Sequence, residues 1–132
     1  MEFIHLHVHD EFSYLDSAIR VEDLAALCHE RGISAIAQTN HGNIDGAYRF
    51  SKAMSAVGVK PLIGCEMYVV PNANVKEKYE KKNHLTVIAI NENGWRNLCS
   101  IMTKANVEGF YGKPRVSPEW LLEQNEGLVV LT

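Results

Sequence analysis

The chain has 132 residues, of which 46% are hydrophobic and 22% are charged, and its formal net charge at pH 7 is −3. These values are ordinary for one globular domain, and the slightly acidic balance argues against a surface that coats DNA over its whole extent. Its three cysteines form no CxxC pair, which excludes a zinc ribbon and a disulfide framework. With no signal peptide and no apolar run long enough for a membrane, we expect a cytoplasmic protein without a membrane partner.

The first predicted strand covers residues 3–8 and begins a run of alternating histidines, His5, His7 and His9. Side chains two positions apart on a strand share a face, so we expect the three imidazoles on one side and apolar side chains on the other. Imidazoles without partners are costly to bury, but their neutral ring nitrogens bind zinc, manganese and iron. The first thirty residues also hold seven acids against one base, Arg20. The pattern predicts a divalent metal site at the start of the chain.

The remainder alternates helices and strands. In chain order, the expected elements are a helix over 21–31 that Gly32 ends, a buried strand over 33–39, a helix from Asn43 to Ala56, a strand over 61–70, a polar loop over 71–83, a strand over 84–90, a helix over 94–106, an irregular loop over 109–115, a short helix starting at Ser117-Pro118, and a strand over 128–131. The signals are apolar residues at helical spacing, glycine stops and a serine–proline start. Val21, Leu24, Ala25, Leu27 and Cys28 are expected to form the packing face of the first helix.

This alternation predicts the α/β fold class, with a mostly parallel sheet or barrel. A closed α/β barrel usually needs about 200 residues or more. We therefore expect a single unit, residues 1–132, that forms the first half of a larger barrel.

Titratable residues gather where the predicted strands end, which is the edge that carries ligands in parallel α/β folds. His7 and His9 leave the first strand, and Asp16 follows in the next turn. His41 comes after the second strand, and Glu66 lies in the third. Taken singly, each of the last three has a structural explanation, such as a turn cap, a loop histidine or a paired core carboxylate. Their joint placement beside the histidine run favours a metal site.

His84 opens its predicted strand, so a fully parallel sheet would place it at the wrong edge. Either that strand runs antiparallel to its neighbours, or the loop over 71–83 folds back over the site. The charged run 76–82 within that loop is expected to be solvated, and a phosphate-contacting role is the weaker interpretation.

Several motifs together resemble the PHP (polymerase and histidinol phosphatase) family. They are HLHVH at 5–9, FSYLD at 12–16, TNHGN at 39–43 and KPLIGCE at 60–66. Within the family, four further stretches resemble the branch at the amino terminus of the alpha subunits of bacterial replicative DNA polymerase III. These are HLTV at 84–87, NL at 97–98, EGFYGKPR at 108–115 and EGL at 126–128. The resemblance covers essentially the whole chain.

The resemblance implies a distorted seven-stranded β/α barrel of PHP type and a cluster of up to three zinc, manganese or iron ions. The positions that match its metal ligands are His7, His9, Asp16, His41, Glu66 and His84. His5 matches a position beside the ligands, where an outer hydrogen bond orients one of them. Asn40 stands where the family usually has aspartate, so it keeps a hydrogen-bond acceptor but brings no charge. Three further family ligands, a cysteine or histidine and an Asp-x-His pair, are expected beyond Thr132.

The chemistry that the resemblance implies is metal-assisted hydrolysis of a phosphoester. In the polymerase setting this is a 3′–5′ proofreading exonuclease attached to a DNA-directed DNA polymerase, a nucleotidyltransferase of DNA replication. Its partners would be a DNA 3′ end, the rest of the polymerase chain and other replisome subunits. Catalytic residues other than the metal ligands are not indicated. Because part of the ligand set is missing, we expect residues 1–132 alone to hydrolyse DNA poorly or not at all.

Two alternatives stay open. One is a non-catalytic, metal-stabilised scaffold that braces the polymerase or docks a separate proofreading subunit, which the neutral Asn40 would suit. The other is a phosphomonoesterase like histidinol phosphatase, against which the 108–115 stretch speaks.

Overall fold

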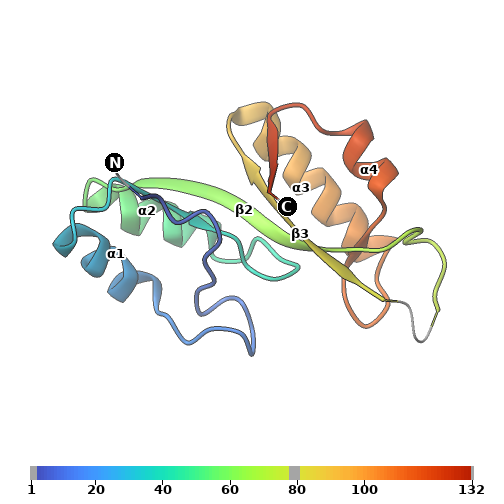
Figure 1. Ribbon diagram of the computed structural model, residues 1–132, viewed down its shortest axis with the longest axis horizontal. Helices are drawn as coiled ribbons and strands as arrows, with labels where there is room; N and C mark the ends of the chain where they lie inside the picture. Colours follow the sequence, from blue (N-terminus) through green and yellow to red (C-terminus); the bar gives the residue numbers. More distant parts are fainter. Residues whose placement is uncertain (1–2, 78–80, 132) are drawn as a thin grey trace.

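The computed structural model describes residues 3–77 and 81–131. Within these ranges the elements are α1 (Val21–Glu30), β1 (Ala35–Gln38), α2 (Ala47–Ala56), β2 (Lys60–Val69), β3 (Asn83–Ala89), α3 (Glu92–Val107), β4 (Arg115–Val116), α4 (Pro118–Glu123) and β5 (Leu128–Leu131). The strands form one sheet in the order β1-β2-β3-β5, with β4 beside β2. Helices α1 and α2 lie at one end of the long strand β2, and α3 and α4 lie at the other (Figure 1). The expected α/β class is confirmed.

The sheet is mixed, and the expectation of a mostly parallel sheet is wrong. Strand β2 pairs in parallel with β1 and β4, but β3 runs antiparallel to both β2 and β5. The reason lies in the connection after β2. Parallel neighbours need a crossover, usually a helix, whereas the described part of the 71–83 loop is irregular and returns the chain beside the strand it has left. Residues 78–80 of the charged run lie outside the described residues.

The prediction of a strand over residues 3–8 is also wrong. This segment makes one isolated parallel bridge, between His5 and Ile36, and no continuous ladder. The backbone N–H of Thr39 donates to Val8 O, but the Val8 N–H donates to the Thr39 hydroxyl, both at 2.9 Å. This side-chain bond replaces a backbone bond and interrupts the ladder. The apolar side chains of Ile4 and Leu6 in this segment are exposed.

Two helix predictions need correction. Leu27 lies outside the packing face of α1, with an exposed fraction of 44%. Helix α2 begins at Ala47 rather than at Asn43, because the Asn43 side chain accepts the Asp45 N–H in a local turn. The residue before the helix, Gly46, has a φ of 74°, where a Cβ would collide with the Phe12 ring.

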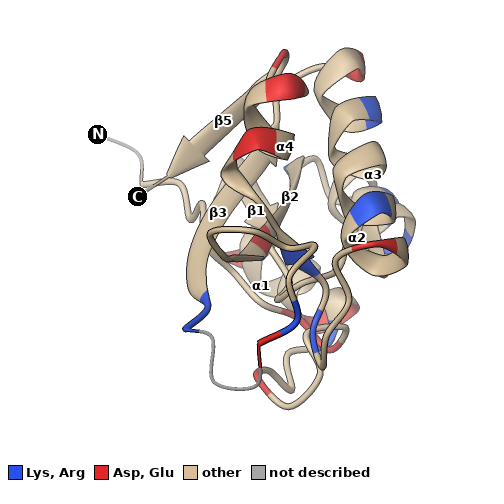
Figure 2. Ribbon diagram, turned by 90° about the vertical axis from the view of Figure 1, so that its right-hand side faces the viewer, with Lys and Arg blue, Asp and Glu red and all other residues tan. Residues whose placement is uncertain are grey.

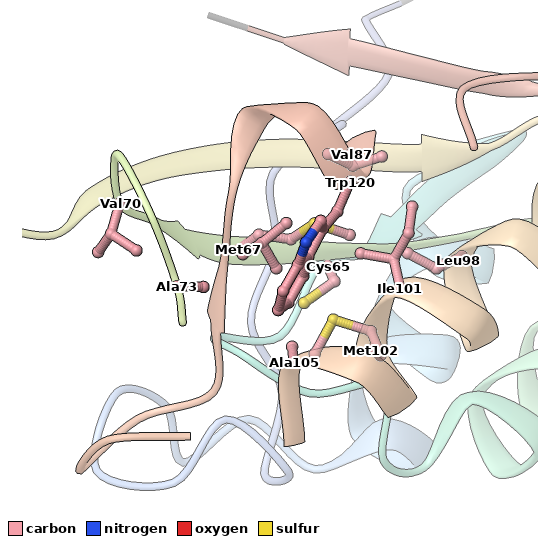
Figure 3. Packing of buried hydrophobic residues seen from close by; sticks show 11 residues of the cluster. Cys65, Met67, Val70, Ala73, Val87, Leu98, Ile101, Met102, Ala105 and Trp120 are labelled. Atoms are coloured by element: carbon pink, nitrogen blue, oxygen red, sulfur yellow. The ribbon is translucent and has the colours of Figure 1, made fainter. Parts of the chain in front are cut away.

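Two clusters of buried side chains stabilise the fold. The first packs the sheet against α3 and α4 and comprises Cys65, Met67, Val70, Ala73, Val87, Leu98, Ile101, Met102, Ala105, Val116 and Trp120 (Figure 3). The second joins α1 and α2 to β1 and comprises Val21, Leu24, Ala25, Cys28, Ile36, Phe50, Met54 and Val59. Burial of one large apolar side chain contributes about 1.5–3 kcal/mol, so packing at both ends holds the central strands in place.

Basic and acidic positions both occur on several elements of the fold (Figure 2). None of the helices in the described ranges combines the length and apolar character needed to cross a membrane.

Candidate metal centre

Strand β2 divides the apolar core from a polar cluster, because successive side chains of a strand point to opposite faces. Cys65 and Met67 are fully buried in the core between the sheet and helices α3 and α4 (Figure 3). Glu66 and Tyr68 point the other way and contact histidines. His84 pairs with Tyr68 across the antiparallel β2–β3 ladder, and residues directly opposite each other share a face. The antiparallel direction of β3, one of the two alternatives for His84, therefore delivers it to this cluster.

The Glu66 carboxylate is where three imidazoles meet. Its Oε2 lies 2.9 Å from His7 Nε2 and 2.8 Å from His9 Nε2. Its Oε1 lies 3.3 Å from His84 Nδ1. The backbone N–H of Glu66 donates to Asn40 O at 3.0 Å and fixes the residue in place. One oxygen of the carboxylate thus faces His7 and His9, and the other faces His84.

A second series of contacts runs from His41 to His9 through Asp16 and Ser13. Asp16 Oδ2 lies 3.0 Å from His41 Nδ1 and accepts the Ser13 hydroxyl at 3.0 Å. Ser13 Oγ also lies 3.1 Å from His9 Nδ1 and accepts the backbone N–H of His41 at 3.1 Å. An ionised carboxylate only accepts hydrogen bonds, so His41 donates through Nδ1–H. Its other ring nitrogen, Nε2, then keeps a lone pair for a ligand.

The surroundings of both carboxylates favour their ionised forms. Burial opposes ionisation of Glu66, but the hydrogen bond from His7 and the neighbouring imidazoles outweigh it and lower its pKa. The pKa of Asp16 is lowered first by its hydrogen bond with His41 and then by that with Ser13. Both side chains are therefore anionic at neutral pH, the state in which carboxylates bind metal ions.

Two groups of three side chains in the described ranges are arranged so that each can hold a metal ion. They are His7, His9 and Glu66, and His41, Glu66 and His84, and the ligand atoms within each group lie within 4.8 Å of one another. His41 Nε2 is buried and has no hydrogen-bond partner among the described residues, which is costly unless a ligand takes its lone pair. Mixed imidazole and carboxylate donors suit divalent transition metals. The residues present therefore fit divalent metal ions.

All six residues predicted as ligands lie in this one cluster, but they do not occupy equivalent places. Asp16 is outside both three-residue groups and contacts His41 instead. His5, predicted beside the ligands, packs its ring edge-on against Phe3, with ring centroids 4.8 Å apart.

Asn40 contributes through its backbone, while its side chain serves a buried carboxylate. Its Nδ2 donates to Asp10 Oδ1 at 2.7 Å, and its Oδ1 accepts the Asp10 N–H at 3.0 Å. Asp10 is 1% exposed and also accepts a hydrogen bond from Gln38 Nε2 at 2.6 Å. The Asn40 side chain therefore supplies a hydrogen-bond donor that the buried Asp10 carboxylate needs.

Sequence reasoning missed three participants, Asp10, Ser13 and Tyr68. Ser13 lies inside the FSYLD motif, and Tyr68 is two residues after Glu66, so the period of a strand placed it on the same face. The Tyr68 ring stacks on the ring of His41, with centroids 4.3 Å apart and an interplanar angle of 14°. No sequence signal distinguished Asp10 from the other early acids.

The chain is similar to known proteins in both sequence and structure. A family profile described as "PHP domain" matches residues 5–132. The chain is 43% identical over 136 residues to DNA polymerase III subunit alpha of Treponema pallidum (strain Nichols), covering 100% of the chain and 12% of the relative. It is 40% identical over 142 residues to the protein of the same name from Aquifex aeolicus (strain VF5), covering 99% and 12%. The chain thus spans 12% of the length of these curated relatives.

Two solved structures share the fold. One is a protein of Bifidobacterium adolescentis described as a metal-dependent phosphoesterase, with a TM-score of 0.54, 15% identity, and coverage of 79% of this chain and 33% of that one. The other is an amidohydrolase from Chromobacterium violaceum with bound sulfate and no metal, with a TM-score of 0.52, 21% identity, and coverage of 76% and 34%. In both cases the chain corresponds to part of a larger α/β fold, which agrees with the partial barrel expected from the sequence.

Proposed function

The chain belongs to the PHP domain family, and from that premise we propose that it is the metal-dependent phosphoesterase part of a bacterial DNA polymerase III alpha subunit, acting as a 3′–5′ proofreading exonuclease. DNA synthesis would reside elsewhere in the complete polypeptide, whose partners are a DNA 3′ end and other replisome subunits. The proposed location is the cytoplasm. The observation that carries this proposal is the Glu66 carboxylate, which has His7 and His9 at Oε2 and His84 at Oε1.

The proposed ligand set follows the two groups of side chains. His7 and His9 would hold one ion with Glu66 Oε2, and His41 and His84 would hold another with Oε1. Because nitrogen donors outnumber oxygen donors in both groups, zinc, manganese or iron is favoured over magnesium. A third ion would need ligands in addition to these residues.

Asp16 has a different role in this proposal from the one expected from the sequence. Its Oδ2 fixes the His41 ring through Nδ1, and Ser13 fixes His9 through its Nδ1. Hydrogen bonds of this kind orient a ligand and select its tautomer, and losing one typically costs about 10–100-fold in metal affinity or activity. Asp16 and Ser13 are therefore positioning residues.

The chemistry that bound divalent ions supply is Lewis acidity, which lowers the pKa of water and polarises a phosphoryl oxygen. The chain itself supplies the anionic Glu66, which would offset the charge of the ions. One side of the site is open to solvent, since the side chains of His7 and His84 have exposed fractions of 52% and 47%. A phosphoester at a chain end can approach from that exposed side, while His41 and Glu66 hold the inner side.

The test uses the complete polypeptide that carries this chain, with a single-stranded DNA labelled at its 5′ end. We expect shortening from the 3′ end that depends on Mn²⁺ or Zn²⁺, and loss of that shortening in His9→Ala. Equal activity in the two proteins would reject the nuclease. Metal retained without any hydrolysis would favour the scaffold alternative. Hydrolysis of a small phosphomonoester without shortening of DNA would favour a phosphatase.

A further inference from the structure

The stretch from Glu108 to Arg115 is a conspicuous motif that the metal centre does not use. It follows α3 and leads into β4, which pairs with the end of β2 at Tyr68. Within it, Tyr111 N–H donates to Lys113 O at 3.0 Å and closes a tight turn. The Lys113 side chain at this turn is exposed. The β2–β4 pairing therefore brings an exposed lysine close to the strand that carries Glu66.

Lys113 reaches the metal centre through one aromatic ring. Its Nζ lies 5.4 Å from the centroid of the Tyr68 ring, within the range of a cation–π contact. Tyr68 in turn stacks on His41 and meets the His84 ring edge-on, with centroids 5.3 Å apart. The ammonium group is thus separated by a single ring from two of the proposed ligands. Among the described residues Lys113 forms no ion pair with an acid.

The backbone around Lys113 is held firmly. The buried Arg115 guanidinium donates to the carbonyl oxygens of Gly109 at 2.9 Å, Val75 at 2.9 Å and Ala73 at 2.8 Å, which joins this stretch to the loop after β2. Pro114 packs against Gly42, where a Cβ would lie 3.2 Å from Pro114 Cγ and 2.7 Å from the Tyr68 ring. An anchored backbone with an exposed, charged side chain at the rim of a site is suited to binding a ligand.

We propose that Lys113 binds a non-bridging phosphate oxygen of the phosphoester substrate at the rim of the metal centre. This inference rests on the proposed phosphoesterase function and adds a substrate-binding residue to it. An ammonium group offers three donors and is a common phosphate ligand, and the absence of an acidic partner among the described residues leaves its charge available. Tyr68 keeps the lysine stem beside His41 and His84, so that the phosphate contact and the metal contacts can be made to the same group.

The test measures binding by the 132-residue chain loaded with Mn²⁺, so that no other domain contributes. The probe is a short fluorescent single-stranded oligonucleotide with phosphorothioate linkages at its 3′ end, and anisotropy is followed over a range of salt concentrations. Lys113→Met keeps the length of the stem and removes the charge. Lys113→Arg keeps the charge. The matched control is Lys104→Met, because Lys104 makes the same kind of cation–π contact, with Trp120 at 4.5 Å, on the side of α3 and α4.

We expect Lys113→Met to bind the oligonucleotide about five- to tenfold more weakly at low salt and its salt slope to fall by about 0.7, the value for one phosphate contact on a single strand. Lys113→Arg and Lys104→Met should retain most of the affinity, and Mn²⁺ equivalents should be unchanged throughout. A merely structural role would not alter the salt slope.

The inference is overturned if Lys113→Met has the affinity and the slope of the wild type, if Lys104→Met loses as much, or if the wild-type chain does not bind the probe. Competition with inorganic phosphate shows whether one phosphate group suffices or whether the DNA chain is required. Failure of the proposed function is a separate outcome, since it is read from DNA hydrolysis by the complete polypeptide.

Discussion

The two faces of β2 differ in almost every physical property, although they are built from alternating residues of the same strand. Cys65 and Met67 are buried among apolar side chains (Figure 3) and belong to neither candidate metal-binding group of the described residues. Glu66 and Tyr68 alternate with Cys65 and Met67 along the strand and point to the opposite face. There Glu66 lies within hydrogen-bonding distance of His7, and Tyr68 stacks on His41. The comparison shows how the chain separates stability from chemistry: the core face fixes the strand, and the site face can then hold charged side chains at defined positions.

The largest expected effect is on the site face, with Glu66→Gln. The amide keeps the shape of the side chain but removes the charge that both histidine groups share, so both proposed ions should be lost. We expect DNA hydrolysis by the complete polypeptide to fall by about 10³-fold, equivalent to several kcal/mol of transition-state stabilisation, and the metal content to fall with it. Glu119→Gln on α4 is the matched control. A Glu66→Gln protein with normal metal content would show that the two faces are not divided as described.

The core face should give the opposite result. Met67→Ala removes a fully buried side chain, and truncations of this kind cost about 2–5 kcal/mol in the free energy of unfolding. Chemical denaturation measures this loss, and metal analysis of the folded fraction should show the same equivalents as the wild type. A stable Met67→Ala chain that no longer binds metal would contradict the separation.

The buried pair behind the site provides a third test. Asn40→Asp would place two carboxyl groups at the 2.7 Å contact now made by Asn40 Nδ2 and Asp10 Oδ1. Like charges in such a pair cannot both ionise, so one folded-state pKa rises above its unfolded value near 4. We expect a loss of about 1–3 kcal/mol at pH 7, which disappears as the pH falls below the unfolded pKa, because both groups are then protonated in both states.

The control for this substitution is Asn93→Asp, which sets an acid beside Glu126 at an exposed contact of 3.2 Å. It should change stability by no more than about 0.5 kcal/mol. If Asn40→Asp is equally neutral at pH 7, the side chain of Asn40 is not needed to satisfy Asp10.

The smallest effect concerns the Cys65 thiol. Burial raises its pKa to about 12, so the folded state keeps the proton after the unfolded chain has lost it. The contribution of this pKa difference to the free energy of unfolding is fully present below the unfolded pKa of about 9. It declines as the pH rises toward 12, and about 1.4 kcal/mol of it is lost at pH 10. Denaturation of the wild type and of Cys65→Ala across pH 8–10 measures the difference, which should narrow with rising pH. A difference that is constant over this range would contradict the burial argument.

The site face has the reverse dependence. The pKa values of Glu66 and Asp16 are lowered by their hydrogen bonds with histidines, so their contribution is present above the unfolded pKa values and is lost as the pH falls through the folded ones.

Patterns local in sequence predicted much of this molecule. The helical spacing of the apolar residues located α1 and α3 closely, and the joint placement of His41 and Glu66 beside the histidine run predicted that they lie in one cluster. The predictions that were wrong concern features set by individual side-chain contacts and by loop geometry, which a local sequence pattern does not reveal. The Asn43 side chain competes with the start of α2, the Thr39 hydroxyl interrupts the pairing of residues 3–8, and the direction of β3 is set by the loop before it.

The residues around the proposed ligands were harder to predict than the proposed ligands themselves. Histidines at alternate positions are conspicuous in a sequence, whereas Ser13 and Tyr68 are ordinary residue types whose roles arise only from the partners that the fold brings to them. The same holds for Asp16. Its place in the FSYLD motif suggested a metal ligand, whereas its contact with His41 supports the role of a positioning residue.

The most direct measurement of the central claim is a titration of the metal-free chain with Mn²⁺, followed by electron paramagnetic resonance. If Glu66 joins two ions, the chain binds two equivalents and the spectrum shows exchange coupling between them. Binding of one equivalent, uncoupled ions at two equivalents, or no retained Mn²⁺ would contradict a shared carboxylate at the centre of the site.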